Sequence, residues 1–445
     1  MSDTPGPENP ENPQDPQNPF KGTPFEALFG GGMPQGGMPD LSHLFGQIQS
    51  LMQPYDGPLN WDVAMDTARK AAAASPDPTP SQKQKDAVAD AVRLADHWLE
   101  GTTSFPSGIS SATAWSKAEW LVNTADVWKK LVEPVAQSSV SSLSGALPEE
   151  MASMAGPMVG FLGKAVGALL ANQTGSGLGA LAGEVLSLSD VGLPLAEPGR
   201  AALLPTNIAP FAEGLGVSED DVLLYLALRE AAHQRLFSGV PWLRDHLIGA
   251  VCDHAAGVEV NLQAIQERVE EQMRGVDMSN PESLQQILEG GMFELPQSPK
   301  QRAALERLEI ALALVEGWVD EVVTMATAER MPAATKLAEA VRRRRAAGGP
   351  AEQVFANLVG LELRPRRLRD AATLWGSLRT RQGIEARDGV WMSPALLPTS
   401  ADLDDPLGFR EGADAPQALT DDDFDAELRK LLEGGGSSGD NPDAE

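Results

Sequence analysis

The most informative stretch of the sequence is Leu228-Arg229-Glu230-Ala231-Ala232-His233, which lies inside a segment with helical periodicity. Ser218 precedes that segment and Asp221 follows three residues later, a pattern typical of a helix N-terminus. We therefore expect one helix from Ser218 to about Phe237. Residues four apart on a helix project from the same face, so Arg229 and His233 should lie side by side, with Glu230 next to them.

This spacing matches two of the three residues of the His-Glu-x-x-His pattern found in zinc hydrolases. In that pattern the two His bind one metal ion, and the Glu acts as general base on the metal-bound water. Glu230 occupies the position of the base and His233 that of the second His. Arg229 occupies the first His position, and a guanidinium, which stays protonated, cannot bind zinc. The motif therefore predicts a metal site that lacks one ligand.

A second candidate segment is Val315-Glu316-Gly317-Trp318-Val319-Asp320. It lies within an apolar helix that we expect from Ser298-Pro299 to about Ala326. Glu316 follows Leu312 by four residues and precedes Val319 by three, so its side chain should project toward the apolar face. A buried carboxylate needs a metal ion or another cation as partner. Glu316 is thus the best candidate for a further metal ligand, and Asp320 is an additional site position one turn later.

Two explanations for the missing ligand remain open. His246 and His254 follow the motif helix, and either could fold back to complete the site. Alternatively, Arg229 replaces the metal ion: its guanidinium would form a forked interaction with Glu316 and also reach Glu230.

The sequence divides into three regions by composition. Residues 1 to 55 are rich in Pro, Gly, Asn and Gln, and we expect a disordered tail. Residues 56 to 410 show mainly helical periodicity, which predicts a mainly α domain with at most a few short strands, one of them near 201–208. Residues 411 to 445 are expected to form an acidic, flexible tail. It contains a short amphipathic helix, in which Phe424 and Leu428 share a face suited to docking.

Composition limits the partners and the compartment. The formal net charge of −28 argues against nucleic acid and anionic membranes as partners. We expect the basic run Arg342 to Arg345 to be a solvated helix face that pairs with the acidic tails or with the body of the protein. Cys252 is the single cysteine, which excludes an internal disulfide and fits a reducing compartment. The apolar stretch 151–170 is interrupted by glycines, so we expect a buried helix and a soluble, cytoplasmic protein.

Jointly, several segments of residues 59–410 resemble one known family. They are the tryptophan-rich segment from Glu119-Trp120 to Pro134-Val135-Ala136, the motif Leu228–Phe237 with Val240-Pro241-Trp242-Leu243, the segment Val315–Asp320, the run Gly360-Leu361-Glu362-Leu363-Arg364-Pro365-Arg366-Arg367, and Leu397-Pro398-Thr399 before Asp402-Leu403-Asp404-Asp405-Pro406. In these segments the sequence is similar to the zincin-like metallopeptidases of bacteria.

The resemblance implies a largely helical domain with the metal ion between the motif helix and the helix that carries Glu316-Gly317. It implies Glu230 as base, and His233 and Glu316 as ligands. Members with the complete motif have His at the position of Arg229, and often at that of Trp318. Two functions therefore stay open: a zinc-dependent peptidase or related hydrolase, or a catalytically inactive binding or regulatory protein in which an Arg229–Glu316 pair replaces the metal. In either case we expect a peptide or protein ligand in the cleft.

Overall fold

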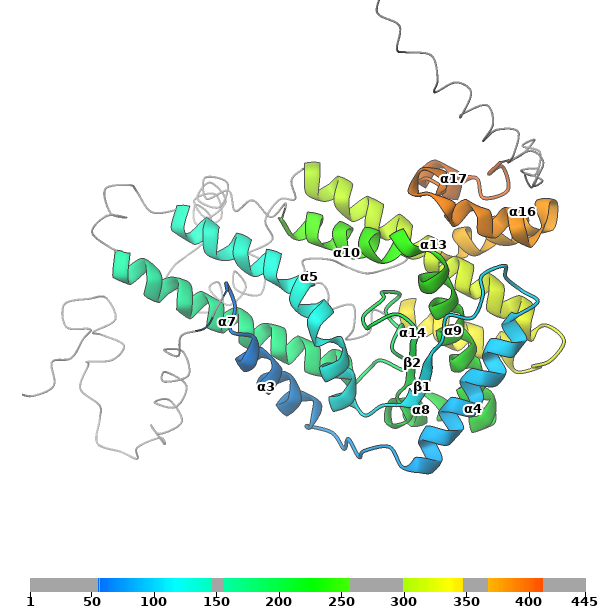
Figure 1. Ribbon diagram of the computed structural model, residues 1–445, viewed down its shortest axis with the longest axis horizontal. Coiled ribbons are helices and arrows are strands. Elements are labelled where there is room, and N and C mark those ends of the chain that lie inside the picture. The colour runs from blue at the N-terminus through cyan, green and yellow to red at the C-terminus, as the bar shows by residue number, and fades with distance from the viewer. Residues whose placement is uncertain (1–54, 56, 146–155, 257–298, 347–366, 411–445) are drawn as a thin grey trace, which may run out of the picture. The chain divides into compact units, whose positions relative to one another are not determined.

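The computed structural model describes residues 55, 57–145, 156–256, 299–346 and 367–410. Within these residues the fold is mainly helical with two short strands, which confirms the predicted fold class (Figure 1). The predicted tails, apart from Tyr55, lie outside the described residues, and so do residues 259–273, for which the sequence pattern predicts a helix.

The elements follow one another along the chain in a fixed order. They are α3 (Trp61–Ala72), α4 (Gln82–Leu99), β1 (Ser111–Ala114), α5 (Lys117–Gly145), α7 (Gly156–Ala182), β2 (Arg200–Leu203), α8 (Pro205–Ala212), α9 (Glu219–Gly239), α10 (Pro241–Ala256), α13 (Pro299–Thr327), α14 (Ala334–Ala346), α16 (Leu368–Gly389) and α17 (Ser400–Asp404), with short 3-10 turns at Val390–Met392 and Pro394–Leu396.

The helices that carry the candidate site begin where the sequence predicts. Ser218 caps α9, because its side chain accepts a hydrogen bond from the backbone N–H of Asp221. Pro299 is the first residue of α13, where proline is tolerated because that N–H has no partner within the helix. Most residues of α9 from Val222 to Phe237 are buried, so this helix is surrounded by other elements.

The predictions for the strands are partly wrong. The spacing of apolar residues predicts a helix from about Thr113, but Ser111–Ala114 forms β1 and pairs in parallel with β2, with Ala112 opposite Ala201. The helix begins at Lys117 because Ser116 and Glu119 exchange hydrogen bonds there. The strand that we expected near 201–208 ends at Leu203, because Pro205 begins α8.

Helices α3, α5 and α7 form one packed group (Figure 1). Gly175 and Gly179 of α7 face α3 so closely that a Cβ at Gly179 would lie 2.6 Å from the carbonyl oxygen of Ala68. This glycine-rich segment therefore forms a close contact between two helices. Among the described residues, no helix is long and apolar enough to cross a membrane.

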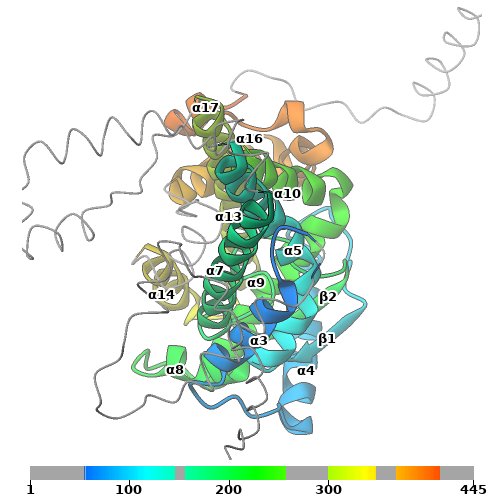
Figure 2. The same cartoon turned by 90° about the vertical axis from the view of Figure 1, so that its left-hand side faces the viewer.

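Helix α9 contacts α4, α10, α13 and α14, and α13 also packs against α16. In Figure 2, α14 lies at the outer side of this second group. The helices bury five complete tryptophan side chains: Trp120, Trp128, Trp318, Trp375 and Trp391. Trp120 and Trp128, both on α5, belong to the main hydrophobic core. Because α9 and α13 lie next to each other, they bring the two candidate segments of the sequence together.

Candidate functional site

The motif helix α9 and the Glu316 helix α13 meet at a buried ion pair. The Nη2 atom of Arg229 lies 2.6 Å from Oε2 of Glu316, and Nε2 of His233 lies 3.0 Å from Oε1 of the same carboxylate. The side chains of all three residues are at most 7% exposed. The structure therefore brings together Arg229, His233 and Glu316, and the pair that we expected between Arg229 and Glu316 is present.

Both nitrogens of the His233 ring face hydrogen-bond acceptors. The Nδ1 atom lies 2.8 Å from the backbone carbonyl oxygen of Arg229, and Nε2 faces the Glu316 carboxylate. A carbonyl oxygen cannot donate, and an ionised carboxylate cannot either. Both ring nitrogens of His233 are therefore engaged by contacts within the protein.

Helix α14 supplies further arginines to the same place. Arg345 forms an ion pair with Oε2 of Glu316, and its Nη2 atom donates to the carbonyl oxygen of Asp190 at 2.7 Å. Arg342 donates to Asp320 at 2.8 Å, and Nη1 of Arg229 lies 3.8 Å from the same carboxylate. The basic run was expected to be a solvated face pairing with the tails or the body. The structure shows that Arg342 and Arg345 pair with the body at the candidate site.

The surrounding charges keep the buried carboxylates ionised. Burial alone would raise the pKa of Glu316, but the positive charges of Arg345, His233 and Arg229 hold this pKa well below its ordinary value. Asp190 behaves in the same way: burial opposes ionisation, and Arg344 and Arg345 nevertheless lower its pKa. The ionised form of each carboxylate is therefore stabilised by cations of this chain.

Glu230, the expected base, has hydrogen-bond partners other than the residues of this ion pair. Its Oε2 atom accepts the backbone N–H of Ser189 at 2.9 Å, and its Oε1 atom accepts Nε2 of Gln234 at 3.0 Å. Glu230 is fully buried, and burial raises its pKa against the opposing effect of these hydrogen bonds. Our expectation that Arg229 also reaches Glu230 is wrong, because the guanidinium is held by Glu316 on another side of α9. Through its hydrogen bonds with Ser189, Glu230 connects α9 to the loop before β2.

That loop also approaches Glu316. Gly192 has a φ of +77°, a conformation that favours glycine, and a Cβ there would lie 2.9 Å from Oε1 of Glu316. The N–H of Gly192 donates to the carbonyl oxygen of Ser189 at 2.8 Å, which closes a turn over the ion pair. The loop therefore covers the candidate site from one side, and Ser189 and Gly192 are contacts that the sequence motif did not indicate.

The other residues considered for the site have different partners. The indole of Trp318 donates to Asp388 at 2.9 Å. The His246 ring packs edge-on against Trp242, and Nδ1 of the buried His254 lies 3.2 Å from the carbonyl oxygen of Gln301. In the described part of the chain, no group of three or more His, Cys, Asp or Glu is arranged to hold a metal ion. The structure thus does not bring His246 or His254 to the motif.

A zinc ion does not fit the residues found at the motif. Zinc binds an unprotonated imidazole nitrogen and a free carboxylate oxygen. Both nitrogens of His233 already have partners within the protein, and Glu316 uses one oxygen for His233 and the other for Arg229 and Arg345. Guanidinium groups thus occupy the place in which a zinc ion would need free ligand atoms.

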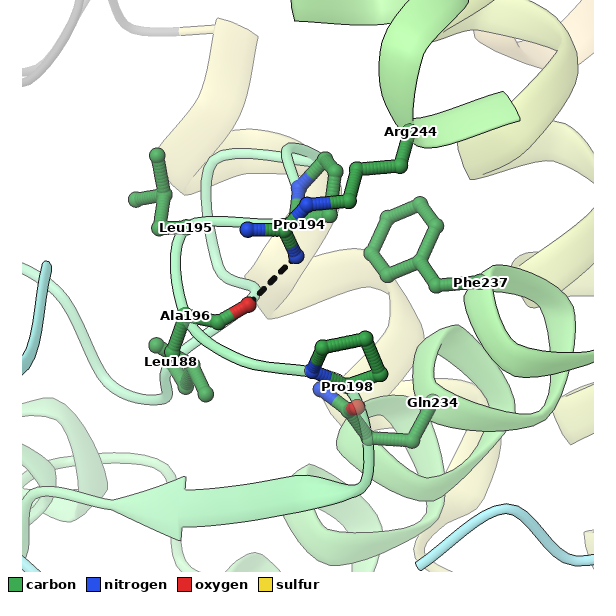
Figure 3. A pocket seen from close by; sticks show the side chains of 8 residues that line it. All are labelled: Leu188, Pro194, Leu195, Ala196, Pro198, Gln234, Phe237 and Arg244. Carbon is green, nitrogen blue, oxygen red and sulfur yellow. Dashed lines mark hydrogen bonds between the residues drawn. The ribbon is translucent and has the colours of Figure 1, made fainter. Parts of the chain in front are cut away.

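A small pocket lies beside α9, which lines it with Gln234 and Phe237 (Figure 3). It is lined by Leu188, Pro194, Leu195, Ala196, Pro198, Gln234, Phe237 and Arg244. Its volume is about 20 Å³, room for one water molecule or a methyl-sized group. Figure 3 shows the Arg244 side chain extending to the carbonyl oxygen of Ala196, at 2.5 Å. This pocket is too small for a peptide side chain of ordinary size.

The fold and the paired helices α9 and α13 define a helical scaffold of the zincin type. The family model for zincin-like metallopeptidases matches residues 59–409, and the chain belongs to this family. Its fold is similar to that of a crystal structure from Chloroflexus aurantiacus, described as a candidate hydrolase with a novel fold. That likeness has a TM-score of 0.53 at 20% sequence identity and covers 78% of this chain and 96% of the other. Among curated proteins, none matches the sequence significantly.

Proposed function

We propose that this protein is a member of the zincin-like family that acts by binding a partner and does not hydrolyse peptides with a metal ion. The observation that carries the proposal is the contact of the Arg229 guanidinium with Glu316, 2.6 Å apart, at the first ligand position of the motif. Metal-dependent hydrolysis needs three protein ligands and an open position for water. Here a ligand position holds a cation, and the cation is bonded to another expected ligand.

The environment of Glu230 supports the same proposal. A general base must come within hydrogen-bond distance of the water from which it takes a proton. The Glu230 carboxylate is fully buried, and both its oxygens accept hydrogen bonds from Ser189 and Gln234. Its role in our proposal is to hold the loop before β2 in place. The partner that we propose is a peptide or protein segment, the ligand class expected for a cleft of this family.

Membership of a metallopeptidase family favours a second candidate, zinc-dependent hydrolysis. The two candidates differ in metal content, which is measured by elemental analysis of the purified protein after zinc loading and desalting, with His233→Ala as control. We expect far less than one zinc per chain in both proteins and no peptidase activity. About one zinc per chain, lost in His233→Ala, would overturn the proposal and favour hydrolysis.

A further inference from the structure

Helix α14 places a second guanidinium at Glu316, the residue expected to be a metal ligand. Arg345 contacts the same Glu316 oxygen, Oε2, as Arg229 does. The side chain of Arg345 is only 14% exposed, and its Nη2 atom is fixed by the carbonyl oxygen of Asp190. Arg345 is therefore a built part of the site and differs from Arg343, an exposed residue of the same helix.

The charges explain why one arginine is not enough. A zinc ion carries two positive charges, and a motif helix that exchanges a neutral His for Arg229 supplies one. Around Glu316 and Asp320 the structure places Arg229, Arg342 and Arg345. Arg229 and Arg345 share the Glu316 oxygen that a metal ligand would need free. Two guanidinium groups on one carboxylate oxygen supply the charge of one divalent ion.

We propose that Arg229 and Arg345 together replace the divalent cation, so that α14 completes in this chain a site that a metal ion completes in other members. The proposal rests on the proposed function, because it assumes that the native site holds no zinc. The proposal assigns to Arg345 a role that the motif does not reveal. Arg345 prevents metal binding at Glu316 even when residue 229 is changed back to His. Restoring His at position 229 is therefore insufficient for metal binding, and Arg345 must be removed as well.

Zinc stoichiometry tests this requirement. The proteins are the wild type, Arg229→His, Arg345→Met, the double variant Arg229→His/Arg345→Met, and the matched control Arg229→His/Arg343→Met. Each is loaded with zinc alone, desalted and analysed, and its fold is checked by circular dichroism. We expect about one zinc per chain in Arg229→His/Arg345→Met and a large excess of empty protein in the other four.

The outcomes separate this inference from the proposed function. Zinc in the wild type would overturn both. No zinc in the wild type but one zinc per chain in Arg229→His would leave the proposed function standing and overturn the role of Arg345. The same conclusion follows if Arg229→His/Arg343→Met binds zinc. A folded double variant without zinc would also overturn the inference. Removal of both guanidinium groups would then not have produced a metal site, so these groups would not be replacing a metal ion.

A second measurement applies if the double variant does not fold. The melting temperature of Arg345→Met is compared in two backgrounds, wild type and Glu316→Gln. If Arg345 acts through the Glu316 charge, its removal lowers the melting temperature in the wild type and much less in Glu316→Gln. Equal losses in both backgrounds would show that Arg345 stabilises the protein independently of Glu316, and would overturn the inference.

Discussion

At the scale of single residues, Arg229 is the residue of the motif helix whose ion pair with Glu316 should contribute most to stability. Its guanidinium is buried and bonded to Glu316, so removing it leaves a buried carboxylate with fewer cations around it. We expect Arg229→Ala to lower the free energy of unfolding by about 3–5 kcal/mol. The measurement is urea unfolding followed by circular dichroism.

The matched control for this prediction is Arg343→Ala, because Arg343 is an exposed arginine on α14 next to the site. A substitution on the surface should change stability by no more than about 0.5 kcal/mol. If Arg229→Ala were as stable as Arg343→Ala, the ion pair would contribute nothing to the fold.

The Glu316 carboxylate makes stability depend on pH. Its pKa in the folded protein lies well below the ordinary value of 4.5, because Arg345, His233 and Arg229 outweigh the effect of burial. A carboxyl group with a lowered pKa stabilises the fold above its unfolded pKa, and this contribution disappears as the pH falls below that value. The difference in unfolding free energy between wild type and Glu316→Gln should therefore be largest near neutral pH and shrink on acidification below about pH 4.5.

Urea unfolding at a series of pH values measures that difference. Glu306→Gln serves as control, since Glu306 is an exposed residue of the same helix α13. Its difference from the wild type should stay small throughout. A Glu316→Gln difference that does not vary with pH would show that the lowered pKa has no effect on stability.

At the scale of elements, local signals predicted helix starts well. Ser81 and Gln84 have the spacing of a capping box and do cap α4, and Pro241, a residue type favoured in the first turn of a helix, begins α10. Strand β1 escaped prediction because four residues, Ser111–Ala114, carry no clear alternation and become a strand only by pairing with β2, far along the chain. The capping pair Ser116 and Glu119 was a usable signal for the true start of α5.

The candidate site was predictable only in part, because contacts between segments far apart in the chain leave no local sequence pattern. Arg229, His233 and Glu316 were accessible because the helical period places Arg229 and His233 on one face and turns Glu316 toward an apolar one. Arg345 was not, because its contact with Glu316 depends on how α14 packs against α9 and α13. A basic run in the sequence does not reveal which of its members turns inward. Arg342 and Arg345 do, whereas Arg343 is exposed.

The contact between α13 and α16 depends on a glycine. A Cβ at Gly317 would lie 2.6 Å from Cβ of Ala371 and 2.7 Å from the backbone nitrogen of Ala372. Alanine favours a helix over glycine by about 1 kcal/mol, but overpacking costs about 1–3 kcal/mol. Because the clash involves backbone, we expect Gly317→Ala to lower the melting temperature.

Gly376→Ala is the control for Gly317→Ala, because Gly376 lies in α16 and its nearest neighbour to an added Cβ is 3.8 Å away, in Glu321. That substitution should raise stability by up to about 1 kcal/mol through helix propensity alone. A thermal scan of the two variants gives opposite signs if the close approach of α13 and α16 is real. Stabilisation by both substitutions would contradict it.

At the scale of the whole molecule, two buried polar networks hold α13 in place. One is the Arg229–Glu316–Arg345 site against α9 and α14. The other joins α13 to α16: Arg387 is fully buried, forms an ion pair with Glu321, and lies 2.8 Å from Asp388 through its Nε atom. Arginine side chains thus form ion pairs with two carboxylates of α13, Glu316 and Glu321, from different neighbouring helices. The fold of this chain therefore relies on guanidinium groups for contacts that connect separate helices, and the Arg229–Glu316–Arg345 site is one instance of that pattern.

The prediction for the whole chain concerns its minimal folded unit. The buried apolar residues of the described structure run from Leu59 to Phe409, and the family model matches almost the same range. We expect a protein consisting of residues 54–410 to unfold in one cooperative transition, at the same temperature as the full-length chain, because the residues removed are not needed for that core. Differential scanning calorimetry compares the two. A protein of residues 74–410 is the control: it lacks α3, whose buried Ala64, Met65 and Ala68 pack in the core, and it should melt at a lower temperature. If residues 54–410 also melted lower than the full chain, segments beyond these limits would contribute to the stability of the core, and the domain limits would have to be moved outward.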